Sequence, residues 1–196
     1  MLKINSRGQE EAPFELLISV IIMGFVIAVG FMAMNELAKK QCQGQMDKTM
    51  QELKRTLELV SKGQGRDSFS FRMPSCYSDA KSRLVIESSS ETKTCTDVCG
   101  GSRLDCTFIQ FYGVSQQGSG YVSRICLDIP PTTDFPEEST ISGSPCDPSK
   151  YLQGNISYDV VSWKEKPVQP GDYMLANEYT LMSDYPRICV YKRKIS

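Results

Sequence analysis

Residues 16–34 read LLISVIIMGFVIAVGFMAM, a run of nineteen residues without a charged side chain. At a rise of 1.5 Å per residue, a helix of this length spans about 28 Å, close to the thickness of a bilayer's hydrocarbon core. A buried helix of a soluble protein is the alternative, but so long a run leaves no polar face for water. A cleaved secretory signal has a shorter apolar region, of about 7–15 residues. The run therefore predicts a retained transmembrane helix within residues 9–35.

The helix is predicted to continue beyond the membrane as an amphipathic segment at residues 36–62. Apolar side chains recur there at helical spacing along one face, and charged side chains occupy the opposite face. Pro13 suits a first helical turn, and Gly63 and Gly65 favour a stop, so one helix from 13 to 61 is expected, about 70 Å long. The apolar face predicts packing against the domain that follows, and it consists of Cys42, Met46, Met50, Leu53, Leu57 and Val60.

Eight cysteines all follow the apolar run. An even number in such a position is typical of disulfides formed in an oxidising compartment. Zinc binding is the alternative, but the paired C-x2-C units of most zinc sites are missing. We therefore expect disulfides, whose pairing the sequence leaves open, with the disulfide of Cys42 tying the helix to the domain. The eight are Cys42, Cys76, Cys95, Cys99, Cys106, Cys126, Cys146 and Cys189.

The cysteines also decide the predicted orientation of the chain. Lys3 and Arg7 precede the apolar run, and Lys39 and Lys40 follow it, so the positive-inside rule gives a near tie. Disulfides persist outside the cytoplasm, which places the C-terminal part there. The sequence thus predicts a single-pass cell-membrane protein with a cytoplasmic N-terminus and an extracytoplasmic, disulfide-stapled domain at residues 66–196.

This domain is predicted to be mostly β-structure. Short runs of β-branched and aromatic residues alternate there with turn residues, a pattern that favours antiparallel pairing over βαβ units. The expected fold class is α+β: a long N-terminal helix packed on an antiparallel β-sheet or sandwich. Asn177 and Glu178 predict a two-residue hairpin turn, and Cys146 is expected to hold down a proline-rich loop at 129–150. The candidate strands are 68–73, 83–87, 106–114, 121–128, 158–164, 173–176, 179–182 and 188–192.

The composition argues against several classes of site. There is no histidine, which removes the common nucleophile–base pairs and all His-containing metal sites. Asp134, Glu137 and Glu138 lack the ligand spacing of a calcium loop. A net charge of −1 favours no nucleic-acid partner. We expect neither enzymatic activity nor a metal or cofactor. A separate signal is Asn155, which begins an N-glycosylation sequon and is the candidate glycosylation site.

The residues before the apolar run carry a further signal. Residues 3–9 read KINSRGQ, a short charged leader that ends in Arg7-Gly8-Gln9. Together with the two-part helix and the β domain, this resembles the class III signal peptide of archaeal type IV pilin-like proteins. In that family a prepilin-type peptidase cuts between glycine and glutamine on the cytoplasmic side and leaves the helix in place. The resemblance implies cleavage between Gly8 and Gln9, which removes residues 1–8; an uncleaved signal anchor is the alternative.

The chain departs from the family at one position. A glutamate often stands fifth in the mature chain, where it is thought to meet a neighbouring subunit's terminal amine; here that position is Pro13. Glu15 is the candidate substitute, although two residues amount to about half a helical turn. Gly24 and Ala28 form a small-xxx-small pair that allows close helix approach in lipid. Glu15, Gly24 and Ala28 are therefore the candidate assembly residues.

The resemblance implies a structural role. The expected function is a pilin-like subunit or minor pilin of a type IV-like surface filament, anchored by its helix and displaying its β domain. Its implied partners are membrane lipid, the peptidase, and other pilin-like subunits in a homo- or hetero-oligomer. The alternative is a monomeric, membrane-tethered extracellular binding or adhesin domain.

Overall fold

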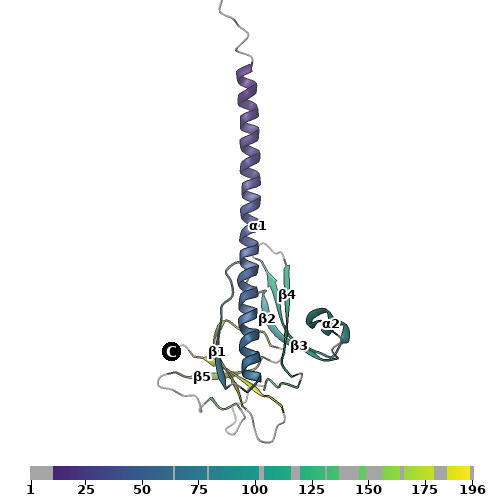
Figure 1. The fold of residues 1–196 in the computed structure, drawn as a ribbon. Helices are drawn as coiled ribbons and strands as arrows, with labels where there is room; N and C mark the ends of the chain where they lie inside the picture. The colour runs from purple at the N-terminus through teal and green to yellow at the C-terminus, as the bar shows by residue number, and fades with distance from the viewer. Residues whose placement is uncertain are drawn as a thin grey trace, which may run out of the picture. The chain divides into compact units, whose positions relative to one another are not determined.

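The computed structural model describes residues 11–63, 65–78, 80–101, 104–115, 120–130, 132–136, 146–148, 156–163, 166–178 and 185–194, with backbone alone at 11–13. The chain divides into two compact units, Met1–Gln43 and Gly44–Ser196. Helix α1 (Glu11–Ser61) contributes to both units (Figure 1).

The predicted helix is present as one 51-residue element, and its C-terminal end lies where the sequence places it. The Gly63 N–H donates to the Val60 carbonyl (3.1 Å) and the Lys62 N–H to the Glu58 carbonyl (3.3 Å). Gly63 has φ of +80°, a left-handed conformation that is strained for residues with a Cβ. The helix therefore ends with a glycine turn of the kind that satisfies its last carbonyls.

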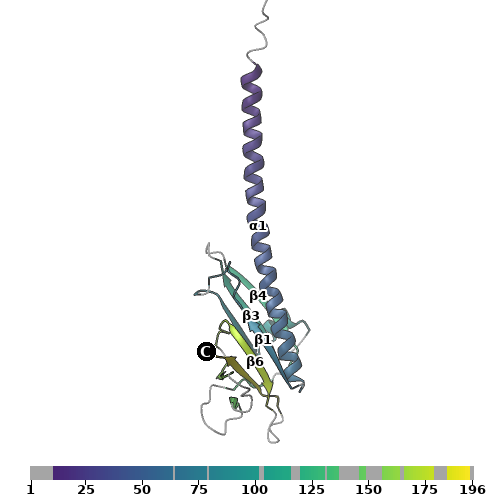
Figure 2. The ribbon, with the colours of Figure 1, turned by 90° about the vertical axis from the view of Figure 1, so that its left-hand side faces the viewer.

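The second unit begins with the C-terminal part of α1, and its amphipathic character is confirmed. Both ribbon views show this part of the helix lying against the strands (Figures 1 and 2). The opposite face, which includes Lys48, Glu52 and Arg55, is exposed. The predicted apolar stripe is buried, with Met46, Met50, Leu53, Leu57 and Val60 all at most 1% exposed.

The second unit also contains two antiparallel sheets, which confirms the α+β class. One sheet has four strands in the order β1-β6-β7-β5, and the other has three in the order β2-β3-β4. A short helix, α2 (Thr92–Cys99), lies between β2 and β3 in the chain. The strands are β1 (Arg66–Phe71), β2 (Arg83–Ser89), β3 (Cys106–Val114), β4 (Gly120–Leu127), β5 (Tyr158–Val161), β6 (Gly171–Asn177) and β7 (Ile188–Arg193).

The four-stranded sheet has buried side chains on both faces. On one face, Phe69 and Phe71 of β1 are buried, together with Leu175 of β6. On the other face, a cluster forms around the disulfide Cys146–Cys189, which ties Cys146 to β7. The cluster contains Cys146, Ala176, Cys189 and Tyr191, with Tyr158, Val160 and Met174 packed against it.

The predicted hairpin at Asn177 and Glu178 is wrong. Asn177 is the last residue of β6, and β6 pairs with β1 along one edge and with β7 along the other. Asn177 is opposite Ile188, so the connection to the paired strand is much longer than two residues. The strand predicted at 179–182 lies outside the described residues.

Gly113 of β3 lies at a position where neighbouring rings leave no room for a side chain. A Cβ added at Gly113 would lie 2.6 Å from ring carbons of both Tyr77 and Phe111. These two rings meet edge to face, with centroids 4.9 Å apart, and Tyr121 lies 6.3 Å from each. Glycine in a strand commonly marks such a close approach.

Candidate functional site

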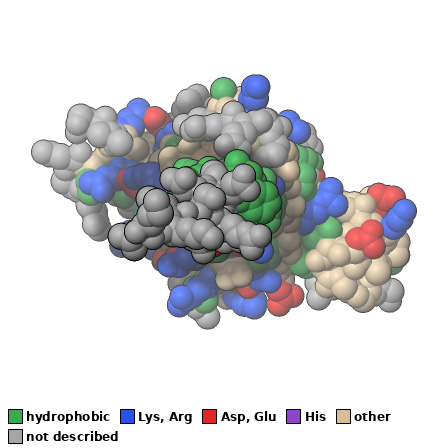
Figure 3. All heavy atoms as spheres, turned by 90° about the horizontal axis from the view of Figure 1, so that it is seen from above, with side chains coloured by type: hydrophobic (Ala, Val, Ile, Leu, Met, Phe, Trp, Pro, Cys, Tyr) green, Lys and Arg blue, Asp and Glu red, His purple; other side chains and the backbone are tan. Residues whose placement is uncertain are grey.

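The first unit presents an apolar surface without a protein covering. Every side chain from 14 to 41 is exposed, including Phe25 at 70%. The most apolar 18-residue window has a mean hydropathy of 2.8 and no burial. Figure 3, which looks along α1 from its N-terminal end, shows hydrophobic side chains (green) near the centre of the view. Because apolar surface of this extent is unfavourable in water, the helix suits a single membrane span.

The candidate assembly residues lie on this exposed helix. Glu15 is exposed, and its backbone carbonyl accepts a hydrogen bond from the Ser19 hydroxyl at 2.9 Å. No heavy atom lies within 4 Å of the Cβ position at Gly24, and Ala28 is exposed. The face around Gly24 is therefore open to a second helix. The processing residues Gly8 and Gln9 and the glycosylation residue Asn155 lie outside the described residues.

All eight cysteines are disulfide-bonded, as expected. The pairs Cys95–Cys106, Cys99–Cys126 and Cys146–Cys189 have Cα–Cα distances of 5.5, 4.9 and 5.5 Å. Cys42 and Cys76 are also disulfide-bonded, and no cysteine is free. Within the described ranges, no group of three metal-ligating side chains is found. The cysteines therefore act as cross-links that staple the domain.

Helix α2 was not predicted, and the disulfides explain its presence. Its eight residues are too few for a stable isolated helix. Cys95 links it to the first residue of β3, and Cys99 links it to Cys126 of β4. Its buried side contacts Phe108 of β3. The local sequence reads as a polar loop, so the helix depends on these covalent and apolar contacts.

A polar contact joins α1 to the three-stranded sheet. One carboxylate oxygen of Asp47 accepts hydrogen bonds from the Tyr121 and Ser123 hydroxyls of β4, both at 3.0 Å. Burial raises the pKa of Tyr121, and burial together with the charges of Tyr121 and Asp47 raises the pKa of Tyr77 to about 12. Both phenols therefore stay protonated at neutral pH, and Tyr121 remains a hydrogen-bond donor to Asp47.

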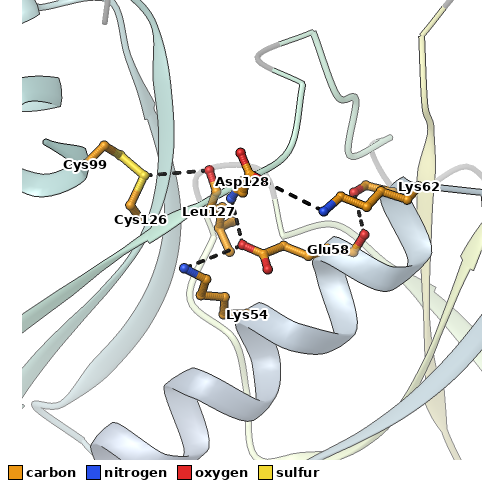
Figure 4. Close-up of polar contacts among 8 residues, drawn as sticks. Lys54, Glu58, Lys62, Cys99, Cys126, Leu127 and Asp128 are labelled. Atoms are coloured by element: carbon orange, nitrogen blue, oxygen red, sulfur yellow. Dashed lines mark hydrogen bonds and ion pairs between the residues drawn. A yellow bond between two sulfur atoms is a disulfide. The ribbon is translucent and has the colours of Figure 1, made fainter. Parts of the chain in front are cut away.

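A second set of polar contacts fixes the end of the helix (Figure 4). The backbone N–H of Asp128, which follows β4, donates to the Glu58 carboxylate at 2.8 Å. Glu58 also lies 3.6 Å from the Lys54 ammonium, and Asp128 lies 3.8 Å from that of Lys62. From the other sheet, the Asn177 amide donates to the Val60 carbonyl at 3.1 Å. Both sheets therefore hold the last turns of α1.

Sequence reasoning missed these polar partners. Asp47 and Glu58 belong to the charged residues assigned to the outer helix face, whereas their acceptor oxygens meet groups more than 60 residues away in the chain. Only the strand register brings these groups to the helix. No local pattern marks them.

Comparison with family models, characterised proteins and solved structures finds no match for this chain.

Proposed function

We propose that this chain is a structural, pilin-like subunit or minor pilin of a type IV-like surface filament. The observation that supports this proposal is the division of α1 into an exposed apolar part and a part that is buried along one face. Residues 14–41 are exposed and mostly apolar, whereas the stripe from Met46 to Val60 is buried in the β-containing unit. One continuous helix thus supplies both a surface for lipid or other helices and a core element of the domain to be displayed.

The disulfides support an extracytoplasmic location for the domain. Eight bonded cysteines without a free thiol suit an oxidising compartment and not the reducing cytoplasm. With the N-terminus cytoplasmic, the leader at residues 1–8 faces the side on which a prepilin-type peptidase acts. The partners in this proposal are membrane lipid, that peptidase and further pilin-like subunits.

N-terminal processing tests the proposal most directly. The mature chain purified from membranes is expected to begin at Gln9, because Arg7-Gly8-Gln9 directly precedes the apolar run. A β-branched side chain at the cleaved position should block the peptidase, so Gly8→Val should accumulate the longer precursor. N-terminal sequencing and intact mass measure both outcomes. Arg7→Lys, which keeps the charge, is the matched control; a mature protein that retains residue 1 or 2 throughout would rule the proposal out.

Assembly gives a separate test on the open helix face. Gly24→Leu should reduce the yield of sheared filaments by at least about tenfold, because a large side chain prevents close helix approach. Gly30→Leu is the matched control: its Cβ position is equally open, and six residues place it about 240° around the helix from Gly24. Equal filament yields for both variants and the parent would remove the face of Gly24 and Ala28 from the interface. A processed chain that forms no filament would favour the monomeric, tethered binding domain.

A further inference from the structure

Residues 88–96 read SSSETKTCT, so six of these nine residues carry a hydroxyl group. The stretch covers the end of β2, the residues that follow it and the first five residues of α2. Stretches rich in serine and threonine are common in O-glycosylated proteins. The contacts of each hydroxyl divide the six into two groups.

Three of the six hydroxyls hold the chain in place between β2 and α2. The Ser88 hydroxyl shares a hydrogen bond with that of Thr107 on β3 (3.1 Å). The Ser89 hydroxyl accepts a hydrogen bond from the Glu91 N–H (3.1 Å), and the Thr94 hydroxyl donates one to the Glu91 carboxylate (2.7 Å). These three groups therefore have a structural role.

The other three hydroxyls, those of Ser90, Thr92 and Thr96, are open to solvent. All three residues are exposed, and their hydroxyls make no hydrogen bond in the part of the chain that the structure describes. Thr92 and Thr96 are four residues apart on α2, which places them on one face of the helix with their Cβ atoms about 5–6 Å apart. All three oxygens are therefore accessible as nucleophiles.

Threonine does not favour this helix. α2 contains three threonines among its eight residues, and a β-branched side chain is a poor helix former. The helix forms nevertheless, because two disulfides clamp it to β3 and β4. Helix stability therefore does not account for Thr92 and Thr96.

The clamped helix lies on the side of the three-stranded sheet away from α1. α2 packs on Phe108, which is opposite Cys126 of β4, whereas Tyr121 and Ser123 of β4 bond to Asp47 of α1. Neighbouring residues of a strand project to opposite faces. Figure 1 shows β3 and β4 between α1 and α2, and in Figure 3 the lobe at the right is mostly tan, as uncharged polar side chains and backbone are. The open hydroxyls thus lie where a modifying enzyme can reach them.

We propose that the hydroxyls of Ser90, Thr92 and Thr96 are acceptors for O-linked neutral sugars. In the transfer step, the hydroxyl oxygen bonds to the anomeric carbon of a sugar carried on a lipid phosphate, and the bond from that carbon to the phosphate oxygen breaks. The lipid phosphate leaves with the bonding electrons, and the hydroxyl proton passes to a base of the transferase. This modification rests on the extracytoplasmic location proposed above and does not depend on filament assembly.

The neighbouring charges favour a neutral sugar over a phosphate. Glu91 lies between Ser90 and Thr92 in the chain, and Asp97 follows Thr96; both carboxylates are on exposed residues. A phosphate on any of the three hydroxyls would be repelled by the adjacent carboxylate, whereas a neutral sugar adds no charge. Glycans are also bulky, solubilising groups that suit an exposed surface.

The test is the intact mass of the full chain, purified in detergent from membranes of the cells that naturally make it. All forms carry Asn155→Gln, so that a sugar on the sequon does not contribute. The parent is expected to exceed the mass of the mature chain by whole sugar residues, and alkaline β-elimination, which releases sugars from serine and threonine, should remove the excess. A variant that combines Ser90→Ala, Thr92→Val and Thr96→Val should lack the added mass.

A matched control changes the three hydroxyls that have hydrogen-bond partners. A variant that combines Ser88→Ala, Ser89→Ala and Thr94→Val should keep the added mass. The fluorescence of Trp163 verifies that both variants are folded. Equal loss of the added mass in both folded variants would show that the open hydroxyls are not selected and would overturn the proposal.

Three further outcomes would also overturn it. A parent at the unmodified mass would refute the acceptor sites directly. Added mass that persists in the variant at Ser90, Thr92 and Thr96 would place the sugars elsewhere, and added mass that a phosphatase removes would show phosphate in place of sugar. The same spectrum shows whether the chain begins at Gln9, so failure of this proposal and failure of N-terminal processing are read separately.

Discussion

Replacing both Cys146 and Cys189 with alanine is expected to lower the free energy of unfolding by about 4 kcal/mol, since a disulfide restricts the unfolded chain more as its loop lengthens. This bond closes a separation of 43 residues, against 27 for Cys99–Cys126 and 11 for Cys95–Cys106. The same reasoning gives about 3.5 and about 3 kcal/mol for the shorter loops. The loss of unfolding free energy should therefore be largest for Cys146–Cys189, intermediate for Cys99–Cys126 and smallest for Cys95–Cys106.

Urea unfolding of the full chain in detergent measures this order. Trp163 is the only tryptophan; it is 2% exposed and lies edge to face with Phe69 and Tyr173, so its fluorescence reports the four-stranded sheet. The two double-alanine variants at the shorter loops are the controls. Equal losses for all three, or no loss at the longest loop, would contradict the role assigned to the bond at Cys146.

The second large effect is expected in the amphipathic part of α1. Leu57 is fully buried, and removing a buried leucine side chain to alanine lowers stability by about 2–5 kcal/mol through lost burial and a residual cavity. Leu57→Ala should also expose the nearby chain to protease. Limited proteolysis and urea unfolding measure the two consequences in the same protein.

Glu52→Ala is the matched control on the opposite face of the same helix. Its side chain is exposed, so the change in stability should stay within about 0.5 kcal/mol. If both variants were as stable as the parent, residues 46–60 would be a linker and not part of the core, and the two-part helix at the centre of the proposed function would be lost.

The elements that the sequence predicted well are those with strong local patterns. The end of α1 at Ser61 follows from an apolar stripe at helical spacing that stops before Gly63. Strand β3 has the predicted bounds because its run is rich in β-branched and aromatic residues. Strand β1 begins two residues before the predicted start, since β6 pairs with the polar residues Arg66 and Asp67.

Features that depend on distant residues were not predictable. Helix α2 is held by Cys106 and Cys126, whose partners no spacing rule identifies. The hairpin at Asn177 was wrong because a turn signal cannot reveal that both edges of a strand are already paired. The hydrogen bond from the Ser70 hydroxyl to the Asp172 carboxylate, 102 residues away, requires the pairing of β1 with β6. Local propensity carries none of this information.

The place of β7 in its sheet has a consequence for biosynthesis. β7 follows every other described strand in the chain, yet it lies between β6 and β5 and carries Cys189. During translation, β6 and β5 emerge first and have no central strand to join them. The four-stranded sheet can close only after residues 188–193 have left the ribosome, when the apolar helix has long since emerged. The apolar helix is therefore synthesised long before the domain can be completed, and the four-stranded sheet stays open until β7 and Cys189 are available.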